Sequence, residues 1–141
     1  MRVRLKRAYV LPAKADGARV LVDRLWPRGV SKDAAKLKTW LKDIAPSNEL
    51  RKWYHARPTQ WPAFRKKYLE ELAEPAALAA LEELHRIASE ASTLTLVFAS
   101  ANETKNNATV LKELLEGIKK PPSSSGPSKS AAVPQRARGR R

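Results

Sequence analysis

The fold and the site of this chain are constrained most by residues 19–29, which read Arg-Val-Leu-Val-Asp-Arg-Leu-Trp-Pro-Arg-Gly. The apolar-rich run from Arg19 to Val22 predicts a buried strand. Pro27 fixes its own φ angle and has no N–H, so the strand cannot continue through it. In open α/β sheets, ligands bind at the carboxyl ends of the strands. We therefore expect a binding site at the end of this strand, and its arginines suit an anion.

Four side chains at this strand end are candidate site residues: Asp23, Arg24, Trp26 and Arg28. Arg24 and Arg28 are candidate ligand-binding residues, and Arg28 is the better placed because it lies in the turn after the strand. Asp23 is either a catalytic carboxylate or a structural one that pairs with one of these arginines, and we favour the pairing. Of the four tryptophans, we expect most in the core, and Trp26 is the one placed to stack on a base or a sugar.

A second set of candidates, Ser47, Arg51 and His55, is spaced four residues apart, which places all three on one stripe of a helix. A guanidinium and an imidazole in one line suit a phosphate or a carboxylate. His55 also suits proton transfer near neutral pH. The structural alternative pairs Arg51 with Glu49 or Asp43 and leaves His55 in solvent.

Strand and helix patterns alternate along the chain. Strands are predicted at residues 3–8, 19–24 and 94–98, while 39–41 fits a strand or a helix. Helices are predicted at 47–54, from 61, from 75 and from 106 or 107 to Gly117, and Ser31 caps a short helical turn. The alternation predicts a single-domain, layered Rossmann-like α/β fold with a largely parallel sheet flanked by helices.

Two of these helices carry more specific expectations. The helix from residue 75 is expected to bury the stripe Leu78, Leu81, Leu84, Ile87 and Ala91. The last helix follows a strand and is capped by Asn106 or Asn107. Because helix N-termini bind anions, Asn106 is also a candidate ligand-binding residue.

Charge divides the chain into a folded body and a basic tail. The chain has 141 residues, 43% of them hydrophobic, which suffices for one domain with a sizeable core. Residues 119–141 carry seven Lys and Arg residues and no acid, half of the net charge of +14. This segment is rich in Pro and Ser and cannot bury enough apolar surface to order itself. The predicted parts are therefore an α/β domain at 1–118 and a disordered basic tail at 119–141.

Composition excludes several classes of function. The chain has no cysteine, so disulfides and thiolate chemistry are excluded. His55 and His85 are too far apart for a zinc site, and no acidic cluster or glycine-rich phosphate loop is present, so we expect no metal and no cofactor. There is no long apolar run and no signal-peptide pattern, so we expect a cytoplasmic protein that binds no membrane. The sequence does not indicate the oligomeric state.

Five segments resemble the YeaO-like uncharacterised family, also called domain of unknown function 488. They are residues 19–29, Ala45-Pro-Ser-Asn-Glu-Leu-Arg-Lys-Trp53, Phe64-x-x-x-Tyr68-x-x-Glu71-Leu72, Leu94-Thr-Leu-Val-Phe-Ala-Ser100 and Asn106-Asn-Ala-x-Val-Leu111. The resemblance covers roughly residues 3–117 and implies one α/β domain with Rossmann-like layering, but no established activity. The chain departs from the family at Ala56-Arg57, where members often carry an acid, and at Lys105, where His or Gln is frequent. Both departures argue against a catalytic mechanism that needs a second acid or base near His55 or Asn106.

Two function classes fit these observations. The first is a pocket for a small anionic ligand or substrate, lined by Arg24, Arg28, Arg51 and His55, with Asp23 orienting the arginines. As an enzyme, it would act by hydrolysis or transfer on a phosphate-bearing or nucleotide-like substrate, with Arg28 and Arg51 neutralising charge and His55 moving a proton. The alternative is a non-catalytic protein that binds nucleic acid weakly and non-specifically through its basic body and tail. The sequence does not decide whether the pocket is catalytic.

Overall fold

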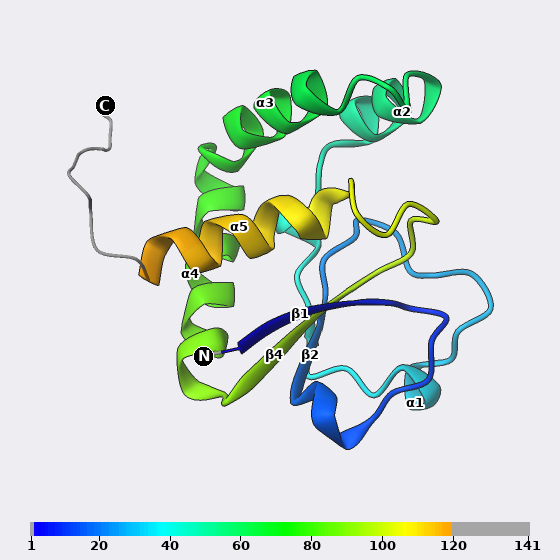
Figure 1. Cartoon of the computed structure of the whole chain (residues 1–141), viewed down its shortest axis with the longest axis vertical. Coiled ribbons are helices and arrows are strands. Elements are labelled where there is room, and N and C mark those ends of the chain that lie inside the picture. Colours follow the sequence, from blue (N-terminus) through cyan, green and yellow to red (C-terminus); the bar gives the residue numbers. More distant parts are fainter. Residues whose placement is uncertain (1, 120–141) are drawn as a thin grey trace.

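The computed structural model describes residues 2–119. At its centre is a four-stranded sheet in the order β1-β4-β2-β3, in which all neighbouring strands are parallel (Figure 1). Leu96 of β4 lies opposite Leu5 of β1 and Val20 of β2. The carboxyl ends of the strands therefore lie along one edge, and the predicted parallel α/β sheet is confirmed. The strands span Arg2–Arg7 (β1), Ala18–Leu21 (β2), Thr39–Trp40 (β3) and Thr93–Phe98 (β4).

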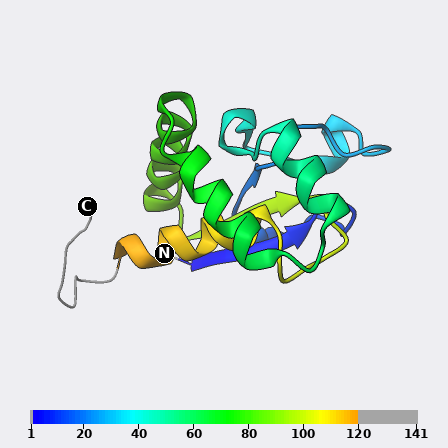
Figure 2. The ribbon, with the colours of Figure 1, turned by 90° about the horizontal axis from the view of Figure 1, so that it is seen from above.

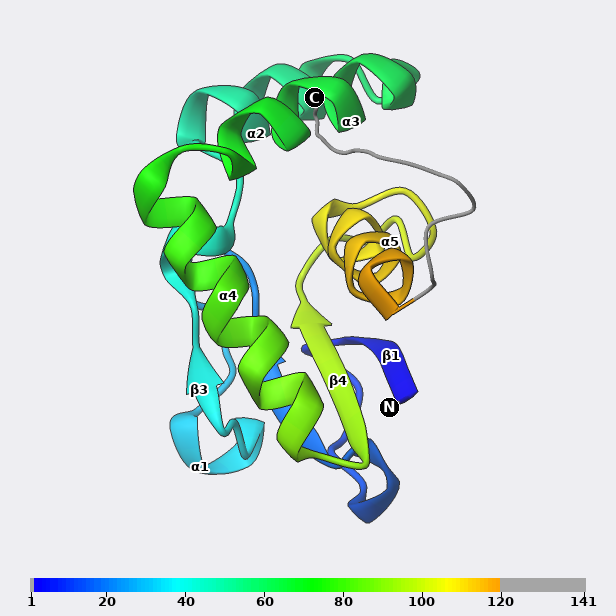
Figure 3. The ribbon, with the colours of Figure 1, turned by 90° about the vertical axis from the view of Figure 1, so that its left-hand side faces the viewer.

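Helices α4 and α5 pack on one face of the sheet (Figure 3). Helices α2 and α3 form a second layer, and α2 lies close to the arrowheads of the strands (Figure 2). The described part contains no helix that is both long and apolar enough to cross a membrane. The helices span Lys32–Ala35 (α1), Asn48–Ala56 (α2), Trp61–Leu72 (α3), Pro75–Glu90 (α4) and Asn107–Lys119 (α5), with 3-10 turns at Lys14–Asp16 (η1) and Lys42–Ile44 (η2).

The helix starts follow the capping rules that the sequence suggested. The Oγ atoms of Ser31 and Ser47 accept hydrogen bonds from backbone N–H groups three residues later, at 3.0 and 3.1 Å. Pro62 and Pro75 stand in the first turns of α3 and α4, where a missing N–H costs nothing. These local signals are strong enough that the sequence predicted the starts of α1, α2, α3 and α4.

The main core lies between the sheet and the helices. From α3 it takes Phe64, Tyr68 and Leu72, which are buried at the spacing that the sequence predicted. A smaller cluster of Ala8, Leu21 and Val97 lies apart from it, with Trp26, Leu37 and Trp40 packed against its margin. The main core also buries Val20, Val22, Leu84, Ile87, Leu94, Leu96, Phe98, Val110, Leu111 and Leu115.

Several expectations need correction. Leu78 is 43% exposed, because the buried residues of α4 are Leu84, Ile87 and Ala88. The α5 helix continues through Gly117 to Lys119. The strand expected at 19–24 ends at Leu21, and the ambiguous residues 39–41 contain the short strand β3. Apart from Lys119, the predicted tail lies outside the described residues.

The tryptophans also depart from the expectation. Trp26, Trp40, Trp53 and Trp61 are all half-buried, so none is fully in the core. Each packs against a core cluster from its margin. His85 is half-buried on α4.

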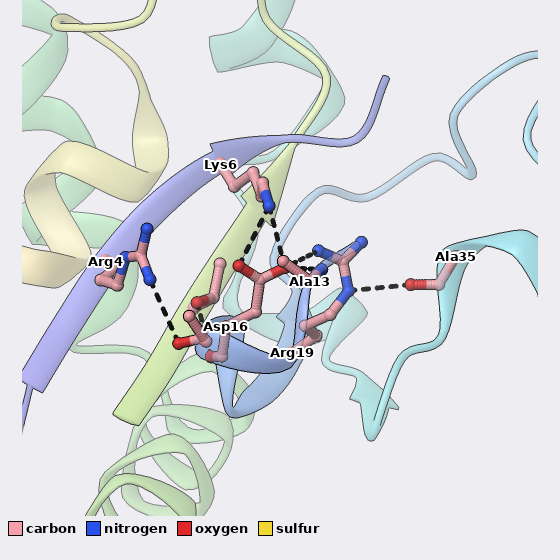
Figure 4. Close-up of polar contacts among 8 residues, drawn as sticks. Arg4, Lys6, Ala13, Asp16, Arg19 and Ala35 are labelled. Carbon is pink, nitrogen blue, oxygen red and sulfur yellow. Dashed lines mark hydrogen bonds and ion pairs between the residues drawn. The ribbon is translucent and has the colours of Figure 1, made fainter. Parts of the chain in front are cut away.

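A buried ion cluster joins η1 to the sheet (Figure 4). The carboxylate of Asp16 accepts from Lys6 at 3.0 Å and from Arg19 at 2.8 Å, and its side chain is 1% exposed. Arg19 also donates to the carbonyl of Ala35, which ties α1 to the sheet. Burial raises the pKa of Asp16, but the Ala13 N–H, Lys6 and Arg19 outweigh it and leave the pKa below its ordinary value. This cluster holds the fold and does not line the cavity described next.

Candidate functional site

A cavity of about 620 Å³ opens among the segments that follow three strands. Loops after β1, β2 and β4 contribute Tyr9, residues 23–28 and residues 99–102. Helix α2 contributes Arg51, Tyr54 and His55, and the start of α5 contributes Asn106 and Asn107. The further lining residues are Pro46, Pro58 and Phe64. The edge where strands end is thus hollowed, as expected for an α/β sheet.

The cavity brings together most of the predicted site residues. Asp23, Arg24, Trp26 and Arg28 line it from the segment after β2, and Arg51 and His55 line it from α2. Asn106 lines it from the residue before α5. The sequence placed these two groups of residues in one site although more than twenty residues separate Arg28 from Arg51. Ser47 is the exception and does not line the cavity.

The segment after β2 is held by hydrogen bonds to backbone carbonyls. Arg24 donates to the carbonyls of Ala45 and Pro46, both at 3.1 Å, and so fixes the approach to α2. The indole N–H of Trp26 donates to the carbonyl of Val30, and its ring meets the Trp40 ring edge to face. Arg24 therefore has a structural role beside its position in the lining.

Asp23 is held differently from the prediction. Its carboxylate accepts from the backbone N–H of Ala99 at 2.8 Å and from Nδ2 of Asn107 at 3.1 Å. Among the described residues it forms no ion pair with Arg24 or Arg28, so the expected pairing is wrong. Burial raises the pKa of Asp23, and the bonds from Ala99 and Asn107 and the charge of Arg51 only partly oppose this. Asp23 joins β2 to the start of α5.

Three basic side chains of the cavity form no ion pair with a carboxylate of the described residues. Arg28, Arg51 and His55 are exposed and line the cavity. Within the described part of the chain, Arg51 forms no ion pair with Glu49 or Asp43, so this part of the structural alternative is wrong, whereas His55 is exposed as that alternative expected. A guanidinium without a bound carboxylate can make a two-pronged contact with a phosphate.

The start of α5 is built by two asparagines with different roles. Asn106 accepts from the Thr109 N–H at 3.0 Å and is therefore the predicted cap. Its Nδ2 donates to the carbonyl of Asn102, which shapes the loop after β4. Asn107 is buried, and its Nδ2 reaches back to the end of β2. The sequence suggested a cap at either position but gave no sign of this second contact.

Aromatic lining residues were missed by the sequence analysis. Tyr54 stacks on Phe64 with ring centroids 4.3 Å apart, and its hydroxyl donates to the carbonyl of Lys105. Tyr9 is 48% exposed at the cavity, with the Arg7 guanidinium 5.2 Å from its ring centroid. Tyr9 follows a strand, so the reasoning applied to the end of β2 would have found it at the end of β1.

The chain matches the family DUF488-N3i, described as the "Inactive DUF488-N3 subclade", over residues 2–133. It belongs to this family. The uncharacterized protein Rv3073c of Mycobacterium tuberculosis is 45% identical over 116 residues, covering 82% of this chain and 95% of that protein. The uncharacterized protein YeaO of Escherichia coli is 41% identical over 120 residues, covering 84% of this chain and 100% of that protein. No solved structure matches the chain.

Two of the segments that resembled this family meet in the structure. In this DUF488-N3i chain, the Glu71 carboxylate accepts from the backbone N–H of Ser47 at 2.8 Å and from its hydroxyl at 2.6 Å. The buried Tyr68 hydroxyl donates to the carbonyl of Ile44. These contacts fix the start of α2 against α3. Ser47 therefore has a structural role at this contact. Its ligand-binding role stays a prediction.

Proposed function

We propose that the protein binds a phosphate-bearing, nucleotide-like ligand in the cavity and acts by binding rather than by turnover. The observation that carries this proposal is the convergence of Arg28 and Arg51, from separate segments, on one cavity with aromatic walls. Guanidinium groups suit phosphate oxygens. The rings of Trp26 and Tyr54 suit the planar face of a base.

The balance of charge in the cavity supports an anionic ligand. Asp23 is the one acidic residue in the lining, against three arginines and His55. Its two carboxylate oxygens already accept hydrogen bonds from Ala99 and Asn107. A phosphate would therefore meet cations that form no ion pair with any carboxylate of residues 2–119, and such charge-assisted contacts are stronger than neutral ones.

Binding without turnover is favoured by the lining and by the family. Catalysis needs a poised nucleophile or base. The Ser100 hydroxyl accepts from the Asn102 N–H at 3.1 Å and shapes its own loop. Asp23 is engaged as described above, which leaves His55 as the group that would move a proton. The family to which the chain belongs carries the description "inactive".

The test is calorimetric titration of the full chain with inorganic phosphate, a nucleoside, and the nucleoside mono- and diphosphate. We expect the phosphorylated nucleosides to bind more tightly than either part alone. Arg28→Ala and Arg51→Ala should each weaken binding about tenfold or more, since a hydrogen bond to a charged group contributes about 1.5–3 kcal/mol.

Arg86→Ala is the matched control, because Arg86 is exposed on α4, away from the cavity lining, and pairs with Glu83 and Glu90. Its loss should leave the affinity unchanged. Negligible binding of every ligand by the unsubstituted chain would overturn the proposal. Conversion of a bound nucleotide, followed by chromatography and lost in His55→Ala, would show an enzyme and overturn the binding-only part.

A further inference from the structure

The hairpin of α2 and α3 carries an unusual density of positive charge. Residues 50–69 contain six Lys and Arg residues and no Asp or Glu, and the hairpin's acids, Glu49, Glu70 and Glu71, lie at its two ends. Elsewhere in the described part some cations pair with carboxylates, as in Lys112 with Glu116 and Arg86 with Glu83, and others lie unpaired but scattered along the chain. Along the hairpin only Arg65 forms such a pair, with Glu113. The hairpin's cations that form no ion pair with a described carboxylate are Arg51, Lys52, Arg57, Lys66 and Lys67.

Trp53 holds two of these cations in place without neutralising them. The Arg57 guanidinium and the Lys67 ammonium each lie 5.2 Å from the Trp53 ring centroid. Arg57 also donates to the carbonyl of Trp53. A cation–π contact restrains a side chain but leaves its full charge available to an anion. The hairpin therefore presents pre-positioned positive charge, which suits a ligand with several phosphates.

This charged surface is continuous with the cavity across α2. At 100° per residue, Arg51 and His55 lie on one flank of α2 and face the cavity, while Trp53 lies on the other flank. Arg57 follows the helix as its C-cap and lies by Trp53, whose ring its guanidinium covers. Lys52 is exposed between the two flanks. A helix with its side chains is about 10–12 Å wide. A chain of a few phosphates leaving the cavity can therefore cross α2 over Lys52 and reach Arg57 and Lys67.

We propose that the α2–α3 hairpin binds the phosphate backbone of a single-stranded nucleic acid whose terminal nucleotide occupies the cavity. The placement of the terminal nucleotide rests on the proposed function; the backbone contact rests on the hairpin alone. A single strand fits because its bases are free to enter an aromatic cavity, whereas a duplex keeps them stacked. A membrane fits less well, because the exposed large apolar side chains, Tyr9, Val10, Leu11, Leu25 and Leu78, all lie outside the hairpin.

The test compares two variants of the full chain with equal loss of charge. The hairpin variant combines Lys52→Gln, Lys66→Gln and Lys67→Gln. The control combines Lys14→Gln, Lys32→Gln and Lys36→Gln, three exposed lysines on η1 and around α1, outside the cavity lining. The probe is a labelled oligothymidylate of about 12 nucleotides, within the range that one single-strand site covers. Fluorescence anisotropy is measured over a series of salt concentrations, with circular dichroism to check that both variants fold.

We expect the hairpin variant to lower the slope of log affinity against log salt by about two, at about 0.7 for each lost phosphate contact. The control should keep the slope of the unsubstituted chain, because the same tail charge is present in all three proteins. Equal slopes for the two variants would overturn the proposal. So would a duplex of equal length that binds as tightly as the single strand, or anionic vesicles whose binding the hairpin variant loses while oligothymidylate binding is kept.

These outcomes are distinguishable from a failure of the proposed function. If no mononucleotide binds but the hairpin variant alone lowers the salt slope, the backbone contact stands and the cavity assignment fails. If mononucleotide binding depends on Arg28 but the two variants have equal slopes, the cavity assignment stands and the hairpin contact fails. Under the full proposal, Arg28→Ala weakens both mononucleotide and oligothymidylate binding, whereas the hairpin variant weakens only the latter.

Discussion

Asn107 and Asp23 lie 84 residues apart in the chain, and Nδ2 of Asn107 donates to Oδ1 of Asp23 at 3.1 Å. The same nitrogen donates to the carbonyl of Val22 at 2.9 Å. The other carboxylate oxygen of Asp23 accepts from the backbone N–H of Ala99. One carboxylate and one amide therefore join the end of β2, the end of β4 and the start of α5. Both residues line the cavity, so its shape depends on this junction.

Asn107→Ala should lower the free energy of unfolding by about 1–3 kcal/mol, because the Val22 carbonyl and one carboxylate oxygen of Asp23 lose the amide that donates to them in a buried place. Urea unfolding at neutral pH measures the loss. The comparison is Asn102→Ala, whose exposed side chain bonds only within its own loop and should cost less. An Asn107 variant as stable as the unsubstituted chain would show that the junction contributes nothing.

The raised pKa of Asp23 predicts a pH dependence of stability. In the folded state its carboxyl holds a proton to higher pH than in the unfolded state. Stability should therefore fall as the pH rises from the ordinary aspartate value, about 4, through the raised folded value, and then level off. Asp23→Asn cannot ionise, so its unfolding free energy should lack this decrease as the pH rises above about 4. Asp43→Asn, an exposed change outside the cavity lining, should retain it.

The sequence predicted the sheet and the helices because their signals are local. Capping serines, prolines in first turns and the apolar run before Asp23 each act within a few residues of the element that they specify. The shared cavity was predictable for a related reason: in a parallel sheet, strand ends are brought together by topology alone. Topology alone places Arg28 at this edge, whereas Arg51 lies on α2 and was assigned to the same site because its stripe with His55 suits the same kind of anion.

What the sequence could not predict depends on pairing between distant side chains. Asp23 stands beside two arginines in the chain, and short-range reasoning paired it with them. In the structure, Asp23 instead accepts a hydrogen bond from Asn107, and the Ser47 hydroxyl donates to Glu71. Neighbours in sequence on an extended segment point in different directions, whereas an asparagine 84 residues away can face the same space. No periodicity encodes such a contact.

The ion cluster predicts a large effect at a site remote from the cavity. Asp16→Asn should destabilise the fold by about 3–5 kcal/mol, since it leaves the buried Arg19 without its carboxylate. The folded pKa of Asp16 is lowered, so its stabilisation is present above about pH 4 and is lost as the pH falls through the folded value. The difference between the variant and the unsubstituted chain in urea unfolding should therefore shrink in strong acid. A difference that is constant with pH would contradict this origin.

Two glycines should respond to alanine with opposite signs. Gly17 has a φ of +63°, and a Cβ there would stand 2.3 Å from the Thr93 carbonyl oxygen. Gly17→Ala should therefore lower stability by more than about 1 kcal/mol, through strain and the clash. Gly117 lies within α5, and a Cβ there meets nothing within 4 Å. Gly117→Ala should raise stability by about 0.5–1 kcal/mol, because alanine is the better helix former. Thermal unfolding of both variants checks the two signs together.

Ser47 and Arg51 stand one turn apart at the start of α2, and substitution should separate their roles. Ser47→Ala removes a helix cap and the hydroxyl that donates to Glu71, so the free energy of unfolding should fall by about 1–2 kcal/mol. Nucleotide affinity should change little, because Ser47 does not line the cavity. Arg51→Ala should do the reverse, since its side chain is exposed, lines the cavity and makes no ion pair in the described part. The measurements are the free energy of unfolding and the nucleotide affinity of both variants.

If Ser47→Ala abolished nucleotide binding while the fold stayed intact, the serine would be a ligand-binding residue, and the purely structural role assigned to it through Glu71 would be wrong.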